Sequence, residues 1–375
     1  MRPLVILAKS RWSPAIRREH ALAELAASAG HAVSFWERPD DVRRAPAGPA
    51  EWVRGLWALG PVGRPLPGIE VHRRSTLLPG HRGGLAERAE GLLLERALRA
   101  HPPPPGSTVV ATTPWQWYGL RRPPGGRLVF DCADDWGALI PRRGDRMAAL
   151  YRRIGREADA VVVASQGLAG LFDGPAALVP NGTPASLLQP PRPAPAPRRL
   201  GYAGTLSERF DAPLVGALLD LLPGWTIDLY GPCHYSGRGG RPAPELEALL
   251  RRPDGRARWH GPVEREGLAT ALDGSAVLVL PHRRRGAITG DAMKLYDYAA
   301  RGRPIVSTRW TEGLELSGPP HLLLADGAET FAEAVRGGAQ EPAGRADERR
   351  RWALANTWQA RWEPWARAIF DASGG

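Results

Sequence analysis

Three residues of one expected helix have the types and the spacing that phosphate and sugar chemistry requires. Lys294, Asp297 and Tyr298 lie in Asp291–Ala300, a segment typical of a helix that ends at Gly302. Positions i, i+3 and i+4 share one helix face, so the three side chains would meet the same ligand. A lysine suits a pyrophosphate, and a carboxylate one turn later suits ribose hydroxyls. An ordinary Lys–Asp pair on a solvated helix explains the same spacing.

The loop before this helix is basic and begins where a buried strand should end. We expect the strand at Ala276–Leu280, and the loop runs from His282 to Gly290. Backbone amides at a helix start attract anions, so Thr289 and Gly290 are expected to cap a phosphate group. His282 stands at the strand end, where it could help. The alternative is a solvated basic loop without a ligand.

A second set of polar residues follows a strand in the first half of the chain. Asp131 and Asp134 come at the end of Leu128–Phe130 and just after it. Either carboxylate could orient or deprotonate an acceptor hydroxyl. Asp-rich turns also cap helices, and Asp134 with Asp135 precedes a possible helix start. For Asp131 we favour a role toward the acceptor hydroxyl, and for Asp134 both roles stay open. Binding of a metal ion by Asp131, Asp134 and Asp135 is a further possibility.

Short apolar runs alternate with helical segments along the chain, as in folds made of parallel strands and crossover helices. Strands are expected at Leu4–Ala8, Ala32–Trp36, Thr108–Thr112, Arg127–Asp131, Ala160–Ala164, Leu178–Pro180, Leu200–Gly204, Thr226–Tyr230, Ala257–His260, Ala276–Leu280 and Ile305–Thr308. Helices are expected at Ile16–Ala29, Leu85–Ala100, Arg146–Glu157, Ala212–Leu222, Leu268–Leu272, Asp291–Ala300 and Glu348–Phe370, the last broken near Pro364. The rest of residues 40–107 is rich in Pro and Gly and shows no clear pattern.

The middle of the chain carries a proline-rich stretch, Gln189–Pro197, which predicts a semi-rigid linker between two domains. The fold class is therefore α/β, with Rossmann-like domains at 1–188 and 198–350. A C-terminal helix at 351–375 is expected to pack back toward the first domain. Ligands of open α/β sheets lie beyond the carboxyl ends of the strands, and two such edges can face each other across a cleft.

Composition limits the function classes. The 375 residues are 43% hydrophobic and 24% charged, as in a globular protein, and no apolar run is long enough to span a membrane. The net charge of +11 is carried by arginine, because Lys9 and Lys294 are the only lysines. Such a balance reflects either a GC-rich coding sequence or a preference for phosphate-bearing partners. Two separate cysteines, Cys132 and Cys233, and no signal peptide indicate a cytoplasmic protein.

An ordered set of motifs resembles the GT-B glycosyltransferases, group 1 or family 4-like. The main block is Lys294-Leu-Tyr-Asp297-Tyr-Ala-Ala-Arg-Gly302-Arg-Pro304-Ile-Val-Ser, which is similar to the family's K-x-x-E-Y-x-A-x-G-x-P-V-V-S signature. Five further blocks occur in the family's order: Glu157–Ser165, Val179–Gly182, Gly201–Asp211, Leu229–Pro232 and His260–Val263. The resemblance covers residues 105–310 well and implies a GT-B fold.

The resemblance also implies roles for individual residues. Arg209 and Lys294 would neutralise a nucleotide diphosphate, which the amides of Thr289 and Gly290 would cap, with His282 beside it. Asp297 would bind the ribose. The strand-end turns at Gly204, Tyr230, Gly231 and Val263 would hold the nucleotide, and Asp131 or Asp134 would serve the acceptor. One departure stands out: the family's first acidic residue of Glu-x7-Glu falls on Thr289, which cannot supply a carboxylate.

The function these features predict is transfer of a sugar from a UDP-, GDP- or TDP-linked donor to an acceptor hydroxyl, with retention and without a metal or other cofactor. The acceptor would be a saccharide, a lipid-linked molecule or a natural product, and contact with an anionic membrane at the inner face is compatible with the charge. The alternatives are a GT-B-type sugar-nucleotide epimerase, and a basic protein that binds membranes or nucleic acid. We expect no nucleic-acid partner, because no base-reading module is present.

Overall fold

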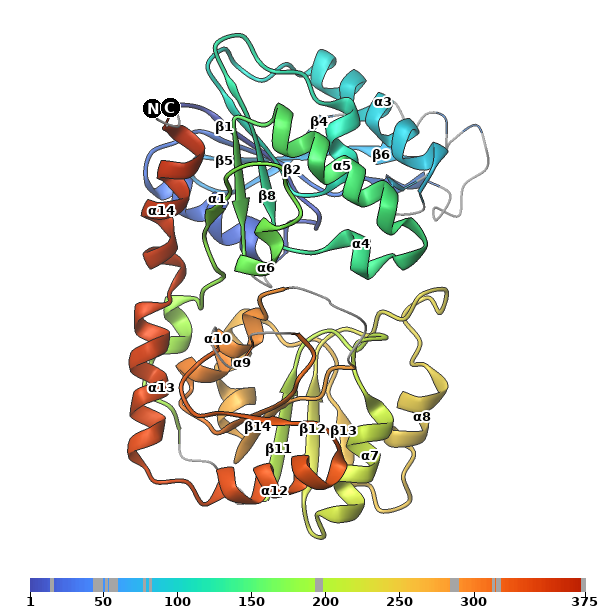
Figure 1. The fold of residues 1–375 in the computed structure, drawn as a ribbon, viewed down its shortest axis with the longest axis vertical. Helices are drawn as coiled ribbons and strands as arrows, with labels where there is room; N and C mark the ends of the chain where they lie inside the picture. Colours follow the sequence, from blue (N-terminus) through green and yellow to red (C-terminus); the bar gives the residue numbers. More distant parts are fainter. Residues whose placement is uncertain are drawn as a thin grey trace. The chain divides into compact units, whose positions relative to one another are not determined.

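The computed structural model describes residues 1–13, 17–42, 50, 53, 60–76, 79–80, 83–192, 198–283, 290–311, 314 and 318–371. The chain forms two compact units, each built on its own parallel sheet (Figure 1). The first unit contains Met1–Pro180, Thr289–Asp291 and Arg361–Gly375, and the second contains Asn181–Ile288 and Ala292–Ala360. The expected α/β class is confirmed.

The first unit has an eight-stranded sheet in which every described neighbour pair is parallel except the last. In spatial order its strands are β10 (Ala177–Leu178), β9 (Ala160–Val163), β8 (Arg127–Cys132), β7 (Thr108–Ala111), β1 (Leu4–Leu7), β2 (Val33–Trp36), β5 (Ile69–Arg73) and β4 (Gly60–Leu66). A short parallel pair, β3 (Asp40–Asp41) with β6 (Ser75–Thr76), stands apart. The helices of this unit are α1 (Arg18–Ser28), α3 (Leu85–Ala100), η3 (Pro114–Gly119), α4 (Trp136–Leu139), η4 (Pro141–Arg143), α5 (Gly144–Glu157) and α6 (Gln166–Ala169).

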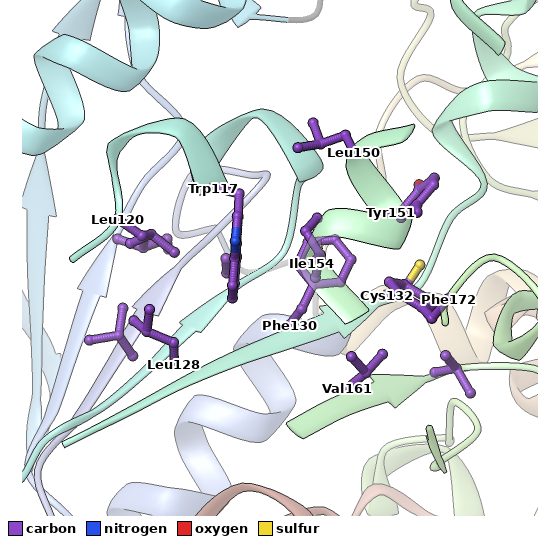
Figure 2. Packing of buried hydrophobic residues seen from close by; sticks show 14 of the residues in the cluster. Trp117, Leu120, Leu128, Phe130, Cys132, Leu150, Tyr151, Ile154, Val161 and Phe172 are labelled. Atoms are coloured by element: carbon purple, nitrogen blue, oxygen red, sulfur yellow. The ribbon is translucent and has the colours of Figure 1, made fainter. Parts of the chain in front are cut away.

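Hydrophobic cores cover both faces of this sheet, which is why its central strands are apolar without alternation. On one face, Phe130 of β8 packs with Trp117 of η3 and with Tyr151 and Ile154 of α5 (Figure 2). The other face packs on α1 and on the C-terminal helix. Alternate strand residues therefore have defined sides, which places the side chain of Asp131 opposite that of Phe130.

The region that gave no clear pattern contains an antiparallel hairpin, β4 with β5. Its first strand reads Gly60-Pro-Val-Gly-Arg-Pro-Leu66, a composition that normally argues against a strand. Pro is tolerated here because β4 is the outermost strand of the sheet, with a register irregular between Pro61 and Leu66. The neighbouring helix prediction, Leu85–Ala100, is confirmed residue for residue.

The second unit has a six-stranded parallel sheet. In spatial order its strands are β13 (Ala257–Trp259), β12 (Thr226–Tyr230), β11 (Arg199–Ala203), β14 (Val277–Leu280), β15 (Ile305–Thr308) and β16 (Leu322–Ala325). Its helices are η5 (Ala185–Leu188), α7 (Ala212–Leu221), α8 (Pro244–Leu250), α9 (Arg265–Asp273), α10 (Met293–Ala300), α12 (Ala328–Ala339) and α13 (Gly344–Ala355). The sequence did not predict β16, the edge strand beside β15.

The C-terminal helix α14 (Trp358–Phe370) runs through Pro364 without a break, so the expected break at that proline is wrong. The interruption lies earlier, at Asn356–Thr357, between α13 and α14. Proline removes one donor from a helix, but burial of the side chains that follow offsets that loss. Trp365 and Ile369 are about 1% and 0% exposed and pack in the core of the first unit.

The boundaries expected at residues 188, 198 and 350 stay predictions. Of the expected linker, residues 193–197 lie outside the described residues. In the described part of the chain, no helix has the length and apolar character needed to cross a membrane.

Candidate active site

Three glycines mark the carboxyl edge of the second unit's sheet. Gly204 follows β11, Gly231 follows β12 and Gly261 comes two residues after β13. The Gly204 N–H donates to the carbonyl of Tyr230 at 2.8 Å, and the Gly231 N–H donates to the carbonyl of Gly261 at 2.7 Å. A Cβ on Gly231 would overlap the carbonyl of Gly204, so side chains are excluded and backbone lines this edge.

Lys294 crosses this edge from the first turns of α10. A Cβ on Gly204 would overlap Lys294 Cε, so the lysine lies directly on the glycine. Its Nζ stands 5.5 Å from the ring centroid of Tyr202, within cation–π distance. Tyr298, also on α10, holds the end of β11, because its hydroxyl accepts from the Ala203 N–H at 2.8 Å. The helix and strand are thus tied together where the lysine emerges.

His282 is buried beside these cations. Burial, with the charges of Lys294 and Arg209, lowers its pKa well below the usual value, so the ring is neutral at neutral pH. The backbone N–H of His282 donates to Thr308 Oγ1 at 3.1 Å, and its ring meets that of Trp310 edge-on at 5.6 Å. The effect of both cations on one histidine means that Arg209, Lys294 and His282 share one positive region.

Asp297 lies one turn after Lys294 and is largely withdrawn from water. Its Oδ1 accepts a hydrogen bond from Thr183 Oγ1 at 2.9 Å. Burial raises its pKa to about 7, although Thr183 and the charge of Lys294 act in the opposite direction. The carboxyl group is therefore poised between its two protonation states at neutral pH.

An aromatic pair stands at the ends of β12 and β13. The rings of Tyr230 and His260 stack with centroids 4.7 Å apart, and His260 Nε2 lies 2.7 Å from Asp228 Oδ1. Trp259 Nε1 donates to the carbonyl of Gly231 at 2.9 Å. Val263 follows in the next turn and is half-buried. A flat ring face at a backbone-lined strand edge is suited to a planar base.

In the first unit, Asp131 is enclosed in a buried ion pair. Its two carboxylate oxygens each accept from Arg18 Nε at 3.0 Å, and Trp365 Nε1 donates to Oδ2 at 3.3 Å. The side chains of Arg18 and Asp131 are each about 3% exposed. Charges so buried must be paired. This arrangement ties β8 to α1 and α14, and a role of Asp131 toward the acceptor stays a prediction.

Asp134 has a different environment, at the carboxyl edge of the same sheet. It forms an ion pair with Lys9, which follows β1, and the two side chains are 26% and 20% exposed. The Asp134 carbonyl accepts from the Tyr151 hydroxyl at 3.0 Å, which fixes the backbone. Gly290 belongs to the same unit and makes an isolated backbone bridge with Asp134. Thr289 lies outside the described residues.

The structure brings Gly204, Arg209, Tyr230, Gly231, His282, Lys294 and Asp297 together in the second unit, and it gives Asp131 and Asp134 different environments. Sequence reasoning missed three contributors: Tyr202, Thr183 and Lys9. Lys9 carried a signal, since it is one of only two lysines. Tyr202 and Thr183 carried none, because their partners lie 92 and 114 positions away along the chain. Among the described residues, no three His, Cys, Asp or Glu side chains gather as a metal site would require.

Comparison with known proteins agrees with this geometry. Residues 214–339 match the family described as glycosyl transferases group 1. Sucrose-phosphate synthase from Thermosynechococcus elongatus is similar over 98% of this chain and 98% of its own, with a TM-score of 0.73 at 17% identity. Anabaena HepE in complex with UDP and glucose is similar over 98% and 99%, with a TM-score of 0.66 at 16% identity. The trehalose 6-phosphate synthase of Burkholderia multivorans is similar over 98% of this chain and 98% of its own, with a TM-score of 0.66 at 14% identity. No curated protein matches this sequence.

The chain has the fold of the GT-B glycosyltransferases, and its residues 214–339 match the family described as glycosyl transferases group 1. The match and the fold together support a glycosyltransferase that depends on a nucleotide sugar. This confirms the expectation drawn from the sequence.

Proposed function

We propose that the second unit binds the nucleotide diphosphate of a sugar donor and that the chain transfers the sugar to an acceptor hydroxyl. The observation that carries this proposal is the position of Lys294, which lies on Gly204 at a strand edge lined by backbone. A side chain that crosses a glycine can reach a ligand seated on the same edge. The charges of Lys294 and Arg209 both act on His282, which supports a positive region of the strength a diphosphate needs.

The proposed chemistry is stabilisation of the leaving group. Negative charge grows on the diphosphate as the glycosidic bond breaks, and fixed cations and donors there lower the barrier. Lys294 and Arg209 would meet that charge, and neutral His282 would donate a hydrogen bond. Because these groups supply the charge that a divalent cation would otherwise supply, we propose that transfer needs no metal. Retention of configuration is part of the proposal through the family resemblance.

The base and ribose would lie beside this region. The stacked pair Tyr230–His260 offers a ring face for the base, next to Gly231 and Val263. Asp297 would accept hydrogen bonds from the ribose hydroxyls once it is ionised. HepE is described in complex with UDP and glucose, which supports UDP as the first nucleotide to test.

The acceptor would be served by the first unit, where Asp134 would orient the attacking hydroxyl. A saccharide, a lipid-linked sugar or a natural product fits this role. The net charge of +11 supports contact with an anionic membrane in the lipid-linked case. Sedimentation with phosphatidylglycerol vesicles against phosphatidylcholine vesicles tests that contact separately.

Titration calorimetry with UDP, GDP and TDP, with and without EDTA, tests the donor proposal. We expect one of the three to bind with the same affinity in both conditions, and its sugar conjugate to be hydrolysed slowly to the nucleotide diphosphate. A folded sample that binds none of them overturns the proposal. Binding that is lost in EDTA would overturn metal independence alone.

A further inference from the structure

The two lysines of this chain stand out against its 48 arginines. The chain carries its positive charge almost entirely on arginine, so the two lysines are the positions at which it places a compact ammonium. The two side chains are not interchangeable: the guanidinium is planar and forked, whereas the ammonium is a point charge with three rotatable donors. Lys294 is placed in the donor site. Lys9 has no assigned role.

Lys9 lies at the acceptor edge through the topology of the sheet. Strands β1 and β8 flank β7, and Leu7, Ala111 and Phe130 are in register across the three. Lys9 and Asp134 follow β1 and β8 directly, so they meet beyond the end of β7. That is the edge at which ligands of open α/β sheets bind.

Hydrogen bonds join the ends of strands β1 and β7 next to the Lys9–Asp134 pair. Thr112 Oγ1 and Gln116 Nε2 both donate to the carbonyl of Leu7, at 2.7 and 3.1 Å. Gln116 Oε1 in turn accepts from the Thr112 and Thr113 N–H groups, at 2.9 and 3.0 Å. The strand ends beneath the ion pair are therefore tied together and cannot drift apart.

The charge of a second carboxylate also acts on the lysine. Glu19 is buried, and its Oε1 accepts from Ser10 Oγ at 2.6 Å. Burial alone would lower the pKa of Lys9, but the charges of Asp134 and Glu19 outweigh burial and raise it. Likewise, burial would raise the pKa of Glu19, but Lys9 and His20 outweigh it. The charges of the two carboxylates thus keep the ammonium protonated, and Asp134 is the one paired with it.

We propose that Lys9 is a positioning residue for the transfer reaction. Its ammonium, paired with Asp134, fixes that carboxylate at the sheet edge, where the carboxylate accepts a hydrogen bond from the attacking hydroxyl. This inference rests on the proposed function. Because the pair neutralises itself, it suits an uncharged hydroxyl rather than an acidic group.

The test compares Lys9→Met, Lys9→Arg, Asp134→Asn and the double variant Lys9→Met/Asp134→Asn. The donor probes are UDP-glucose, GDP-mannose and TDP-glucose, and water takes the place of the acceptor, so hydrolysis is measured without knowing the natural acceptor. We expect Asp134→Asn and Lys9→Met each to lower kcat at least about tenfold, because misplacement of an orienting group is costly. Nucleotide affinity should stay unchanged, and Lys9→Arg should recover only part of the rate.

The double variant shows whether Lys9 acts through Asp134. We expect it to be no slower than Asp134→Asn alone. An ion pair with a merely structural role would move the melting temperature and leave kcat below that temperature unchanged, which overturns the inference. So does a further loss of rate in the double variant, because Lys9 would then act independently.

The matched control is Arg11→Met. Arg11 lies in the same loop and pairs with Asp40, away from Asp134. Its kinetics should equal those of the wild type. A wild-type protein that neither binds these nucleotides nor hydrolyses their sugars overturns the proposed function, and this inference with it. Normal wild-type turnover with an unaffected Lys9→Met overturns the inference alone.

Discussion

The carboxyl edges of the two sheets carry charge in different ways. In the first unit, Asp131 pairs with Arg18 and Asp134 pairs with Lys9, so each carboxylate has its own cation. In the second unit, Lys294 and Arg209 act together on a neutral histidine, and burial raises the pKa of the nearby carboxyl, Asp297. At the edge of the first unit the charges cancel within ion pairs, whereas the edge of the second unit carries a net positive charge.

This difference indicates which substrate each edge can bind. A diphosphate brings two or more negative charges and is stabilised by an edge at which cations predominate. A sugar hydroxyl brings none and needs one oriented acceptor, which an internally paired carboxylate provides. Two largely parallel sheets thus support different chemistries through the residues that follow their strands.

The largest expected effect tests whether the two pairs of the first unit really differ. Asp131→Asn leaves the Arg18 guanidinium buried without its countercharge. We expect a loss of about 3–5 kcal/mol in the free energy of unfolding, measured by urea denaturation. Asp134→Asn is the control, because its partly exposed pair is worth at most about 1 kcal/mol. Equal losses from both substitutions would show that Asp131 and Asp134 have the same kind of role.

Sequence patterns predicted the fold class and most of the elements, because parallel strands and crossover helices leave strong local periodicity. They failed where tertiary context decides. Pro364 was expected to break a helix that the burial of Trp365 maintains, and β4 was hidden by Gly and Pro that an edge strand tolerates. Site residues were found where they stand in a motif and missed where, as with Thr183, only a long-range contact places them.

Two neighbouring glycines sharpen the description of the donor edge. Gly231 has φ of +131°, and a Cβ there would overlap the backbone carbonyl of Gly204, which cannot move aside. We expect Gly231→Ala to cost about 3 kcal/mol of unfolding free energy. At Gly204 the obstacle is the flexible end of Lys294, so Gly204→Ala should keep the fold and displace the lysine. Calorimetry should then show weaker nucleotide binding with little change in stability; the reverse result would contradict the proposed contact.

Lys294→Ala measures the positive charge of that edge directly. We expect nucleotide diphosphate binding to weaken by about 1.5–3 kcal/mol, the value of a hydrogen bond to a charged group. Calorimetry with the nucleotide that binds best is the measurement. Arg251→Ala removes an exposed cation of the same unit and serves as the control. If both variants bind equally well, Lys294 does not contact the diphosphate.

The smallest expected effect depends on pH and concerns Asp297. Its pKa of about 7 in the folded protein exceeds its usual value of 3.8, so the unfolded chain releases this proton first. The contribution of protonated Asp297 to the unfolding free energy is therefore fully present below about pH 4 and is lost as the pH rises through 7. Between pH 6 and pH 8 the loss should be about 1 kcal/mol. Asp297→Asn cannot ionise, so its unfolding free energy should change less over this interval. The amount by which this variant is more stable than the wild type should therefore increase with pH.

In the wild type, nucleotide affinity should rise over the same interval, because the ionised carboxylate accepts from the ribose hydroxyls more strongly. A parallel rise in Asp297→Asn would assign that change to the nucleotide's own titration and remove Asp297 from the ribose site.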